Sequence, residues 1–262
     1  LGPDIRAVIV TDFEKTSATA LVEGVLDEDA GGAVAAYRAV LGCESTDRLD
    51  PVLMTGTTVL VDDDLLERIF PRFEQWVSKR NLNIKFDYIE RGGYFEIRGK
   101  GKDWLPRHYT MMITEMFQDG VTKCLVGTRG LLGEGWDASR INVLVDLTTV
   151  TTSMSINQLR GRSFRLDKHW PEKVSNNWDI VCLADEFTKG FDDYLRFKRK
   201  HKQLYGVCDD GAIEKGVGHV HAAFTEAEPE GVSETMEIFN EEMLMRARNR
   251  GRARELWGIG QP

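Results

Sequence analysis

Short runs of branched apolar residues alternate along the chain with segments in which apolar residues recur at helical spacing. Such runs predict buried strands, and the helical spacing predicts helices with one apolar face. The predicted strands lie at 7–10, 52–60, 123–126, 142–147 and 178–184. The predicted helices lie at 33–41, 65–77, 104–117, 151–165 and 191–205, and in the helix at 151–165 the apolar members are Met154, Leu159 and Phe164.

Residues 84–101 alternate between apolar and polar positions around Arg91-Gly92-Gly93, which predicts a β-hairpin. One interpretation is a hairpin that reaches into a nucleic-acid duplex and stacks aromatic rings on bases. The rings available for this are Phe86, Tyr88, Tyr94 and Phe95. The other interpretation is a hairpin that only packs on the rest of the fold, because alternation by itself indicates a half-buried sheet.

Three consecutive acids, Asp62, Asp63 and Asp64, stand directly before the apolar spacing of the 65–77 helix. They resemble a metal-binding cluster, but carboxylates also stabilise the positive end of a helix. We therefore interpret them as a helix start and predict no metal site.

Composition indicates a protein with a sizeable core, because 42% of its 262 residues are hydrophobic. The formal net charge is −8, whereas most nucleic-acid-binding proteins carry a positively charged surface. The four cysteines show no C-x-x-C spacing, and Cys124 and Cys182 lie in apolar runs, so we expect buried thiols in the cytoplasm. No apolar run is long enough to span a bilayer, and no signal peptide opens the chain.

Candidate binding residues follow the predicted strand at 123–126. Its glycine-rich continuation, Gly127-Thr128-Arg129-Gly130 and then Gly-Glu-Gly-Trp-Asp at 133–137, suits a loop whose backbone approaches a ligand. Glu134 and Asp137 place carboxylates beside it. The strand at 142–147 carries Asp146 near its carboxyl end, the edge at which open parallel sheets bind ligands.

A second set of candidates lies on the predicted helix at 151–165. Gln158, Arg162 and Arg165 are three or four positions apart, so they share one face. Guanidinium groups suit phosphate oxygens, which makes a bound anion one interpretation. Two surface arginines paired with carboxylates are the other.

Both sets together resemble a known family. Thr128 and the GEGWD sequence, followed after one strand by Q-x-x-G-R-x-x-R at 158–165, are similar to motifs V and VI of superfamily 2 helicases and translocases. The resemblance covers at least 6–204, and Thr11-Asp12 fall where that family has motif IV. It implies an α/β fold, with a RecA-like, mostly parallel sheet flanked by helices, an inserted β-hairpin and a helical C-terminal extension. The implied domains are the C-terminal RecA-like domain at 1–205, with an insertion at about 42–104, and an acidic, then arginine-rich extension at 206–262.

The resemblance also implies roles for individual residues. Arg162 and Arg165 are similar to the arginine fingers that reach ATP bound to a partner domain, and are thus the expected catalytic residues. The implied nucleotide-binding residues are Gly135, Asp137, Gln158, Arg162 and Arg165. The implied nucleic-acid-binding residues are Thr11, Asp12, Thr128, Arg129 and Gly130.

The family places ATP and Mg²⁺ mainly on an N-terminal RecA-like domain. No phosphate-loop motif occurs in this sequence, and the chain opens at Leu1 directly before a core strand, so we expect a fragment whose partners are that domain and nucleic acid. Gln158 replaces the histidine of the DEAD-box subgroup, and the loop that ends at Asp137 is longer, which favours DNA over RNA. Two alternatives stay open: a RecA-like module that binds nucleic acid without catalysis, and an unrelated α/β enzyme that uses Glu134 and Asp137 for acid–base chemistry.

Basic and histidine-containing segments follow. The helix at 191–205 is the most basic stretch, able either to lie along a phosphate backbone or to be simply solvated. His219 and His221 alternate on a strand-like segment. Arg246, Arg250 and Arg254 share a helical face, which is predicted to pair with the acids at 226–242 or to dock on the N-terminal domain.

Overall fold

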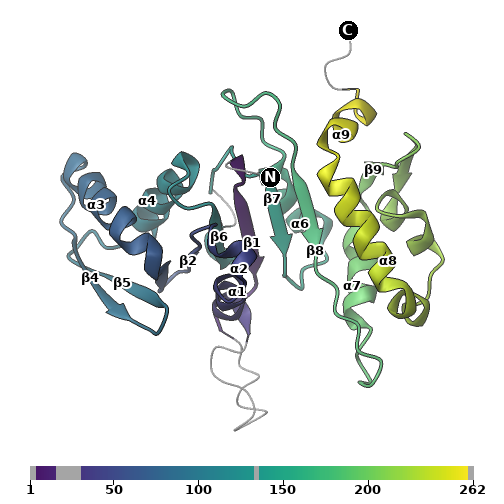
Figure 1. Cartoon of the computed structure of the whole chain (residues 1–262), viewed down its shortest axis with the longest axis horizontal. Coiled ribbons are helices and arrows are strands. Elements are labelled where there is room, and N and C mark those ends of the chain that lie inside the picture. The colour runs from purple at the N-terminus through teal and green to yellow at the C-terminus, as the bar shows by residue number, and fades with distance from the viewer. Residues whose placement is uncertain (1–3, 16–30, 133–135, 259–262) are drawn as a thin grey trace. The chain divides into compact units, whose positions relative to one another are not determined.

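The computed structural model of the chain describes residues 4–15, 31–132 and 136–258 (Figure 1). Contacts within the chain divide it into two compact units. The sheet unit comprises the described residues between Gly2 and Thr148 together with Arg162–Asn177. The C-terminal unit comprises Thr149–Gly161 and the described residues from Trp178 onward. The division predicted at residue 205 stays a prediction.

The sheet has the strand order β4-β5-β3-β2-β6-β1-β7-β8. Its strands are β1 (Ala7–Thr11), β2 (Val52–Met54), β3 (Val59–Asp62), β4 (Lys85–Glu90), β5 (Tyr94–Lys100), β6 (Cys124–Thr128), β7 (Val143–Asp146) and β8 (Asn176–Asp179). The helices of the sheet unit are α1 (Gly32–Leu41), α2 (Glu44–Asp47), α3 (Asp63–Lys79), α4 (Pro106–Asp119) and α5 (Arg129–Leu132), and α6 (Ser153–Ser163) ends in it. The predicted α/β fold, with a mixed, mostly parallel sheet flanked by helices, is confirmed.

The centre of the sheet is parallel. Strand β1 pairs with β6 on one side and β7 on the other, and β6 pairs in parallel with β2. The strands β2 and β6 are almost entirely buried, which explains why the sequence shows them as continuous apolar runs and not as alternating ones. Strand β7 begins at Val143 because the Asn142 side chain accepts a hydrogen bond from the Arg6 backbone at 2.8 Å and so joins the starts of β1 and β7.

The predicted strand at 52–60 is two strands. Residues 55–58 form a turn, and β2 and β3 pair in antiparallel fashion with Leu53 opposite Leu60. The hydroxyl groups of the turn bind a carboxylate from another segment, a stabilisation that the local apolar pattern does not reveal.

The predicted hairpin is confirmed and forms one edge of the sheet. Its turn requires glycine, because Gly92 and Gly93 have φ values of 70° and 91°, as type I′ turns demand. Phe86 packs against Phe70, Phe73 and Trp104, with ring centroids 5.7 to 5.9 Å apart. These contacts support a hairpin that packs on the fold.

The predicted helix start at the three acids is confirmed, since α3 begins at Asp63 with Asp63 and Asp64 in its first turn. The face that α3 buries carries Leu65, Ile69, Phe73 and Trp76. Trp76 Nε1 also donates to Glu115 of α4 at 2.9 Å, so α3 and α4 are fastened to each other as well as to the sheet.

Three details of the predicted helices and strands were wrong. In α6 the buried apolar residues are Ile156 and Leu159, whereas Met154 and Phe164 are 72% and 59% exposed. The strand predicted at 178–184 is the shorter β8, ending at Asp179. Cys182, beyond it, is exposed and not buried, while Cys124 is buried as predicted.

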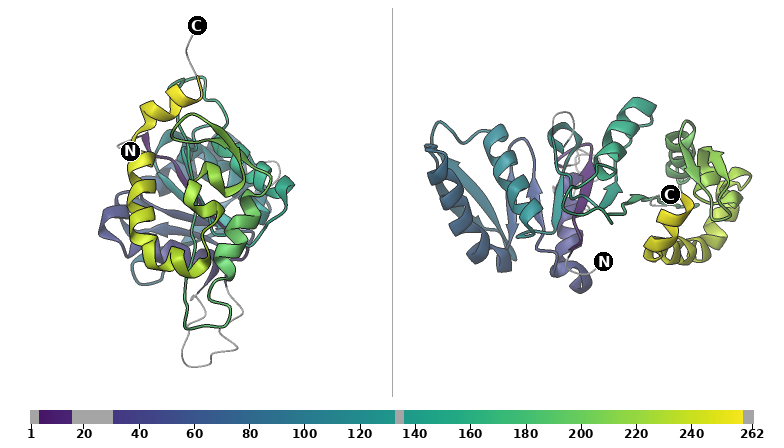
Figure 2. Two further views of the ribbon diagram at one scale, coloured as in Figure 1. Left: turned by 90° about the vertical axis from the view of Figure 1, so that its right-hand side faces the viewer. Right: turned by 90° about the horizontal axis from the view of Figure 1, so that it is seen from above.

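The C-terminal unit holds α7 (Asp192–His201), α8 (Pro229–Arg248) and α9 (Arg250–Leu256). Its remaining elements are a small sheet of β9 (Tyr205–Val207) and β10 (Ile213–Lys215) and the 3-10 helices η3 (Gly216–His219) and η4 (Ala222–Thr225) (Figure 2). The helical C-terminal extension is therefore confirmed. Of the helices in the described ranges, none combines the length and apolar character that a membrane span requires.

Two predictions about this unit were wrong. His219 and His221 flank a turn between η3 and η4 and do not alternate on a strand. The arginine face at 246–254 is interrupted, because α8 ends and Asn249 caps α9 by accepting a hydrogen bond from the Arg252 backbone at 3.2 Å. Arg246 pairs with Asp209 at 3.0 Å, not with the acids upstream.

Candidate nucleotide and nucleic-acid interface

The predicted nucleic-acid-binding residues meet at the carboxyl ends of β1 and β6. Thr11 and Thr128 are the last residues of these strands and stand opposite each other in the parallel register. Thr11 is buried, and its hydroxyl donates to the Phe13 carbonyl at 2.8 Å. Thr128 is half-buried, which leaves its side chain partly accessible at the edge.

Arg129 and Gly130 open the short helix α5, so the segment predicted as a glycine-rich loop is partly helical. Arg129 Nε lies 3.6 Å from Asp12 Oδ1, and the Arg129 side chain is 49% exposed. A Cβ on Gly130 would meet no atom within 4 Å, so no packing constraint selects glycine there. The edge therefore presents an exposed guanidinium beside an open backbone position.

Sequence reasoning missed a carboxylate at the same edge. The strand β2 ends beside β6, and the turn after it offers three hydroxyl groups to Glu14. Glu14 accepts from Thr55, from Thr57 at 2.8 Å and from Thr58 at 2.6 Å. Burial alone would raise the pKa of Glu14, but these hydrogen bonds lower it on balance. The segment after β1 is thus fastened to the β2–β3 turn.

The predicted arginine fingers lie at the carboxyl end of α6 and just beyond it. Arg162 Nη1 donates a hydrogen bond to the Trp136 carbonyl, and Arg165 Nη1 pairs with the Asp137 carboxylate. Trp136 is itself held, because its indole Nε1 donates to Thr114 of α4 at 2.7 Å. The structure therefore brings Asp137 together with both arginines.

The two arginines differ in their surroundings. Arg162 is only 7% exposed, and burial, with the nearby charge of Arg165, lowers its pKa. The Arg165 side chain is 41% exposed and that of Asp137 is 72% exposed. Exposed ion pairs contribute about 0–1 kcal/mol, so Arg165 can exchange Asp137 for a phosphate at little cost.

The other two predicted nucleotide-binding residues, Gln158 and Gly135, do not lie with Asp137 and the arginines in the described part of the sheet unit. Gln158 is exposed on α6, one turn before Arg162, and belongs to the C-terminal unit. Gly135, like Glu134 and Gly133, lies outside the described residues. Within the described part, His, Cys, Asp and Glu side chains form no group of three or more placed to hold a metal ion.

A buried charge cluster in the C-terminal unit was not predicted. Asp179 accepts from Arg160 Nη2 at 2.6 Å and lies 3.1 Å from His201 Nε2 and 3.4 Å from Lys200 Nζ. All four side chains are at most one-tenth exposed. Arg160 stands between Gln158 and Arg162 in the same motif, but its partners are far away in the sequence, and no local pattern reveals them.

This cluster shifts the pKa values of its members. Burial alone would raise the pKa of Asp179, but the hydrogen bond from His201 and the charge of Arg160 lower it well below its usual range. Burial lowers the pKa of His201 despite the hydrogen bond to Asp179. Burial and the neighbouring His201 lower the pKa of His219, whose ring centroid is 5.1 Å away, to about 4. Both histidines are therefore neutral in the folded protein at pH 7.

We expect the thermal midpoint of the C-terminal unit to fall as the pH is lowered from 7 to 4. A histidine with a lowered pKa stays neutral in the folded state while the unfolded state takes up a proton below about pH 6.5, which favours unfolding. The variant His219→Asn keeps a donor for the Gly216 carbonyl and removes one titrating group, so its midpoint should change less over this range. The control is His221→Asn, because His221 lies in the same unit, is partly exposed, and is replaced by a side chain that can still accept from the Ala223 backbone. An equal reduction in slope for both variants would contradict the prediction.

Comparisons with known proteins do not extend this picture. No family model matches the chain, and no significant match to it was found among curated proteins or solved structures.

Proposed function

We propose that this chain is the C-terminal RecA-like motor domain of a superfamily 2 helicase or translocase. In this proposal it supplies arginine fingers to ATP bound on an N-terminal RecA-like domain and grips the backbone of a nucleic acid, with DNA favoured over RNA. The proposed compartment is the cytoplasm.

The observation that supports the proposal is how the candidate residues group. Asp137 meets Arg165 and Arg162 in one place, while Thr128 stands opposite Thr11 in another. The family resemblance separates the same residues into a nucleotide group and a nucleic-acid group. Residues far apart in the sequence thus come together in the combinations that the function requires.

In the proposed reaction Arg165 leaves Asp137 and binds the γ-phosphate as charge develops on it. Arg162, held by the Trp136 carbonyl, keeps the end of α6 in place for this exchange. Mg²⁺, held by the N-terminal domain, would neutralise charge on the phosphates. Closure and opening of the two domains would then shift the grip of Thr128 and the Thr11-Asp12 edge along the strand.

The test is the ATPase activity of the gene product expressed from its own start codon, measured with and without single-stranded DNA or RNA. We expect hydrolysis that nucleic acid stimulates, whereas the 262-residue chain alone should hydrolyse essentially no ATP, because it lacks a phosphate-loop motif. A full-length protein that binds nucleic acid but shows no ATPase activity would overturn the proposal.

A second candidate is a RecA-like module that binds nucleic acid without taking part in hydrolysis. The burial of Arg162 favours it, because a guanidinium held by a backbone carbonyl can have a purely structural role. The same ATPase measurement separates the two candidates. An acid–base enzyme built on Asp137 is not favoured, because a side chain that is 72% exposed does not lie in the closed pocket such chemistry needs.

A further inference from the structure

The C-terminal unit contains a groove lined by basic side chains. Its volume is about 500 Å³. The lining cations come from three places in the sequence: the last turns of α7, the residue after that helix, and the end of β10. The lining residues are Lys198, Arg199, Lys202, Gln203, Lys215, Gly216, Val217, Gly218 and Thr225.

The cations of the groove lack carboxylate partners. Within the described residues, Lys198, Arg199, Lys202 and Lys215 form no ion pair, although elsewhere the arginines and lysines of this acidic chain are commonly paired. Among the residues that the structure describes, no acid lines the groove. Four positive charges without ion-pair partners, gathered in a protein of net charge −8, make a local site for an anion.

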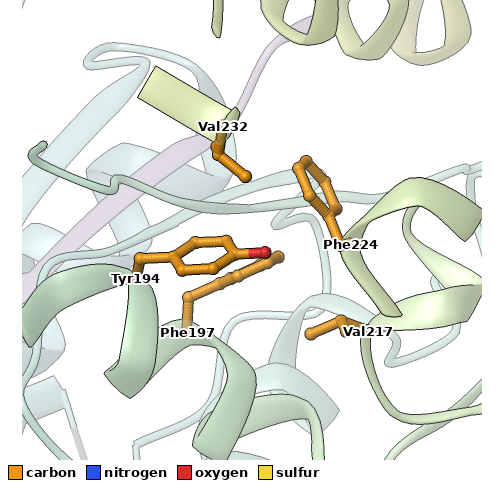
Figure 3. Close-up of a cluster of buried hydrophobic side chains, with 5 residues drawn as sticks. All are labelled: Tyr194, Phe197, Val217, Phe224 and Val232. Atoms are coloured by element: carbon orange, nitrogen blue, oxygen red, sulfur yellow. The ribbon is translucent and has the colours of Figure 1, made fainter. Parts of the chain in front are cut away.

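A buried hydrophobic cluster lies next to the groove and shares Val217 with its lining. Tyr194 and Phe197 of α7, Val217 of η3, Phe224 of η4 and Val232 of α8 form one buried cluster (Figure 3). Val217 belongs to the core and also lines the groove, and Thr225 follows Phe224 directly. The core therefore anchors the helix α7, which carries Lys198 and Arg199, and the η3 backbone that lines the groove.

The rim also carries an accessible aromatic ring. Tyr205 is 65% exposed, and Lys215 Nζ lies 5.7 Å from the centroid of its ring. Gln203 and Thr225 add an amide and a hydroxyl group to the lining. Cations that follow a backbone, next to an aromatic ring on which a base can stack, are the combination that binds single-stranded nucleic acid.

Two neighbouring features reduce the positive potential without cancelling it. The cations on α7 lie at the negative end of that helix, which offsets part of their charge. The Glu214 carboxylate lies against Gly218 at the side of the groove. Lys202 and Lys215 lie outside α7, and neither forms an ion pair with Glu214, so their positive charge is not cancelled.

We propose that this groove binds the phosphodiester backbone of single-stranded nucleic acid, with Tyr205 stacking on a base. The inference deepens the proposed function by adding a contact outside motifs IV to VI. It concerns binding in the absence of nucleotide, so it can fail or succeed independently of the arginine fingers.

The test measures the affinity of the 262-residue chain for fluorescently labelled oligo(dT) and oligo(U) over a range of salt concentrations, without ATP. We expect the triple variant Arg199→Ala, Lys202→Ala, Lys215→Ala to bind at least about tenfold more weakly at low salt. The slope of log affinity against log salt should fall by about 2, because each lost phosphate contact removes about 0.7 on a single strand. Tyr205→Ala should weaken binding and leave that slope unchanged, while Tyr205→Phe should bind like the wild type.

A second triple variant controls for net charge. Lys79→Ala, Lys189→Ala, Arg248→Ala removes three exposed cations that do not line the groove, and it should bind like the wild type. Equal losses for the two triple variants, or wild-type affinity for the first, would overturn the proposal. Unlabelled pyrophosphate that competes as well as unlabelled oligo(dT) at equal concentration would also overturn it, because it would show a site for a small anion and not for a strand.

Discussion

Replacing Arg165 by alanine in the full-length protein is expected to lower ATP turnover by about 10³- to 10⁵-fold, the range found for arginine fingers. The physical reason is that Arg165 has an exposed guanidinium and a partner, Asp137, that it can leave at little cost. Affinity for ATP should change little, since most contacts to the nucleotide would lie on the other domain. The measurement is single-turnover hydrolysis, together with the dissociation constant of a fluorescent ATP analogue.

A matched control exists in the same unit. Arg80 pairs with Glu115 at 2.7 Å, and its side chain is 36% exposed, so Arg80→Ala breaks an exposed ion pair similar to that of Arg165. Its turnover should equal that of the wild type. Arg165 is a better probe than Arg162, because removing a buried arginine risks disturbing the fold. Normal stimulated turnover in Arg165→Ala would remove this residue from the mechanism.

The parts of the fold that could be predicted from sequence are those where burial decides the local pattern. Strands β1, β6 and β7 lie at the centre of a parallel sheet, where an uninterrupted apolar run is the only composition that fits. The helix α3 was equally clear, because its buried residues recur at helical spacing after three acids.

Two wrong predictions, the undivided strand at 52–60 and the apolar residues of the helix at 151–165, have a common cause, which is a polar group stabilised by a distant residue. The turn that splits 52–60 into two strands is held by Glu14, which is more than 40 residues away in sequence from Thr57 and Thr58. On α6 the buried face includes Arg160 and Arg162, because Asp179 and the Trp136 carbonyl each accept a hydrogen bond from one of these guanidinium groups. Local apolar spacing therefore assigned Met154 and Phe164 to the wrong side of the helix.

The candidate site also has a part that the sequence suggested and a part that depends on residues far apart in the sequence. Motif order suggested which residues to look at. The strand register places Thr128 opposite Thr11, and an ion pair joins Asp137 to Arg165, while the roles of these residues stay predictions. The Asp179 cluster could not be predicted, because no short motif connects its residues. The basic stretch at 191–205 was recognised, but the groove that it forms with Lys215 was not. The groove needs α7 and β10 together, and only the folded chain brings them to one place.

Replacing Asp179 by asparagine is expected to lower the free energy of unfolding of the C-terminal unit by about 3–5 kcal/mol. The substitution keeps the shape of the side chain but leaves the buried cations Arg160 and Lys200 without the carboxylate between them. Urea denaturation at pH 7 measures the loss, and Asp185→Asn, at an exposed acid in the same unit, should change stability by less than about 0.5 kcal/mol.

A second substitution distinguishes the two possible causes of this stability loss, which are unpaired buried charge and a general packing defect. If unpaired buried charge is the cause, adding Arg160→Met to Asp179→Asn should recover part of the loss, because it removes one of the cations left without its partner. A packing defect would instead make the two losses add. Additive losses, or a change in Asp179→Asn as small as that in Asp185→Asn, would show that Arg160 and Lys200 do not depend on this carboxylate for their burial.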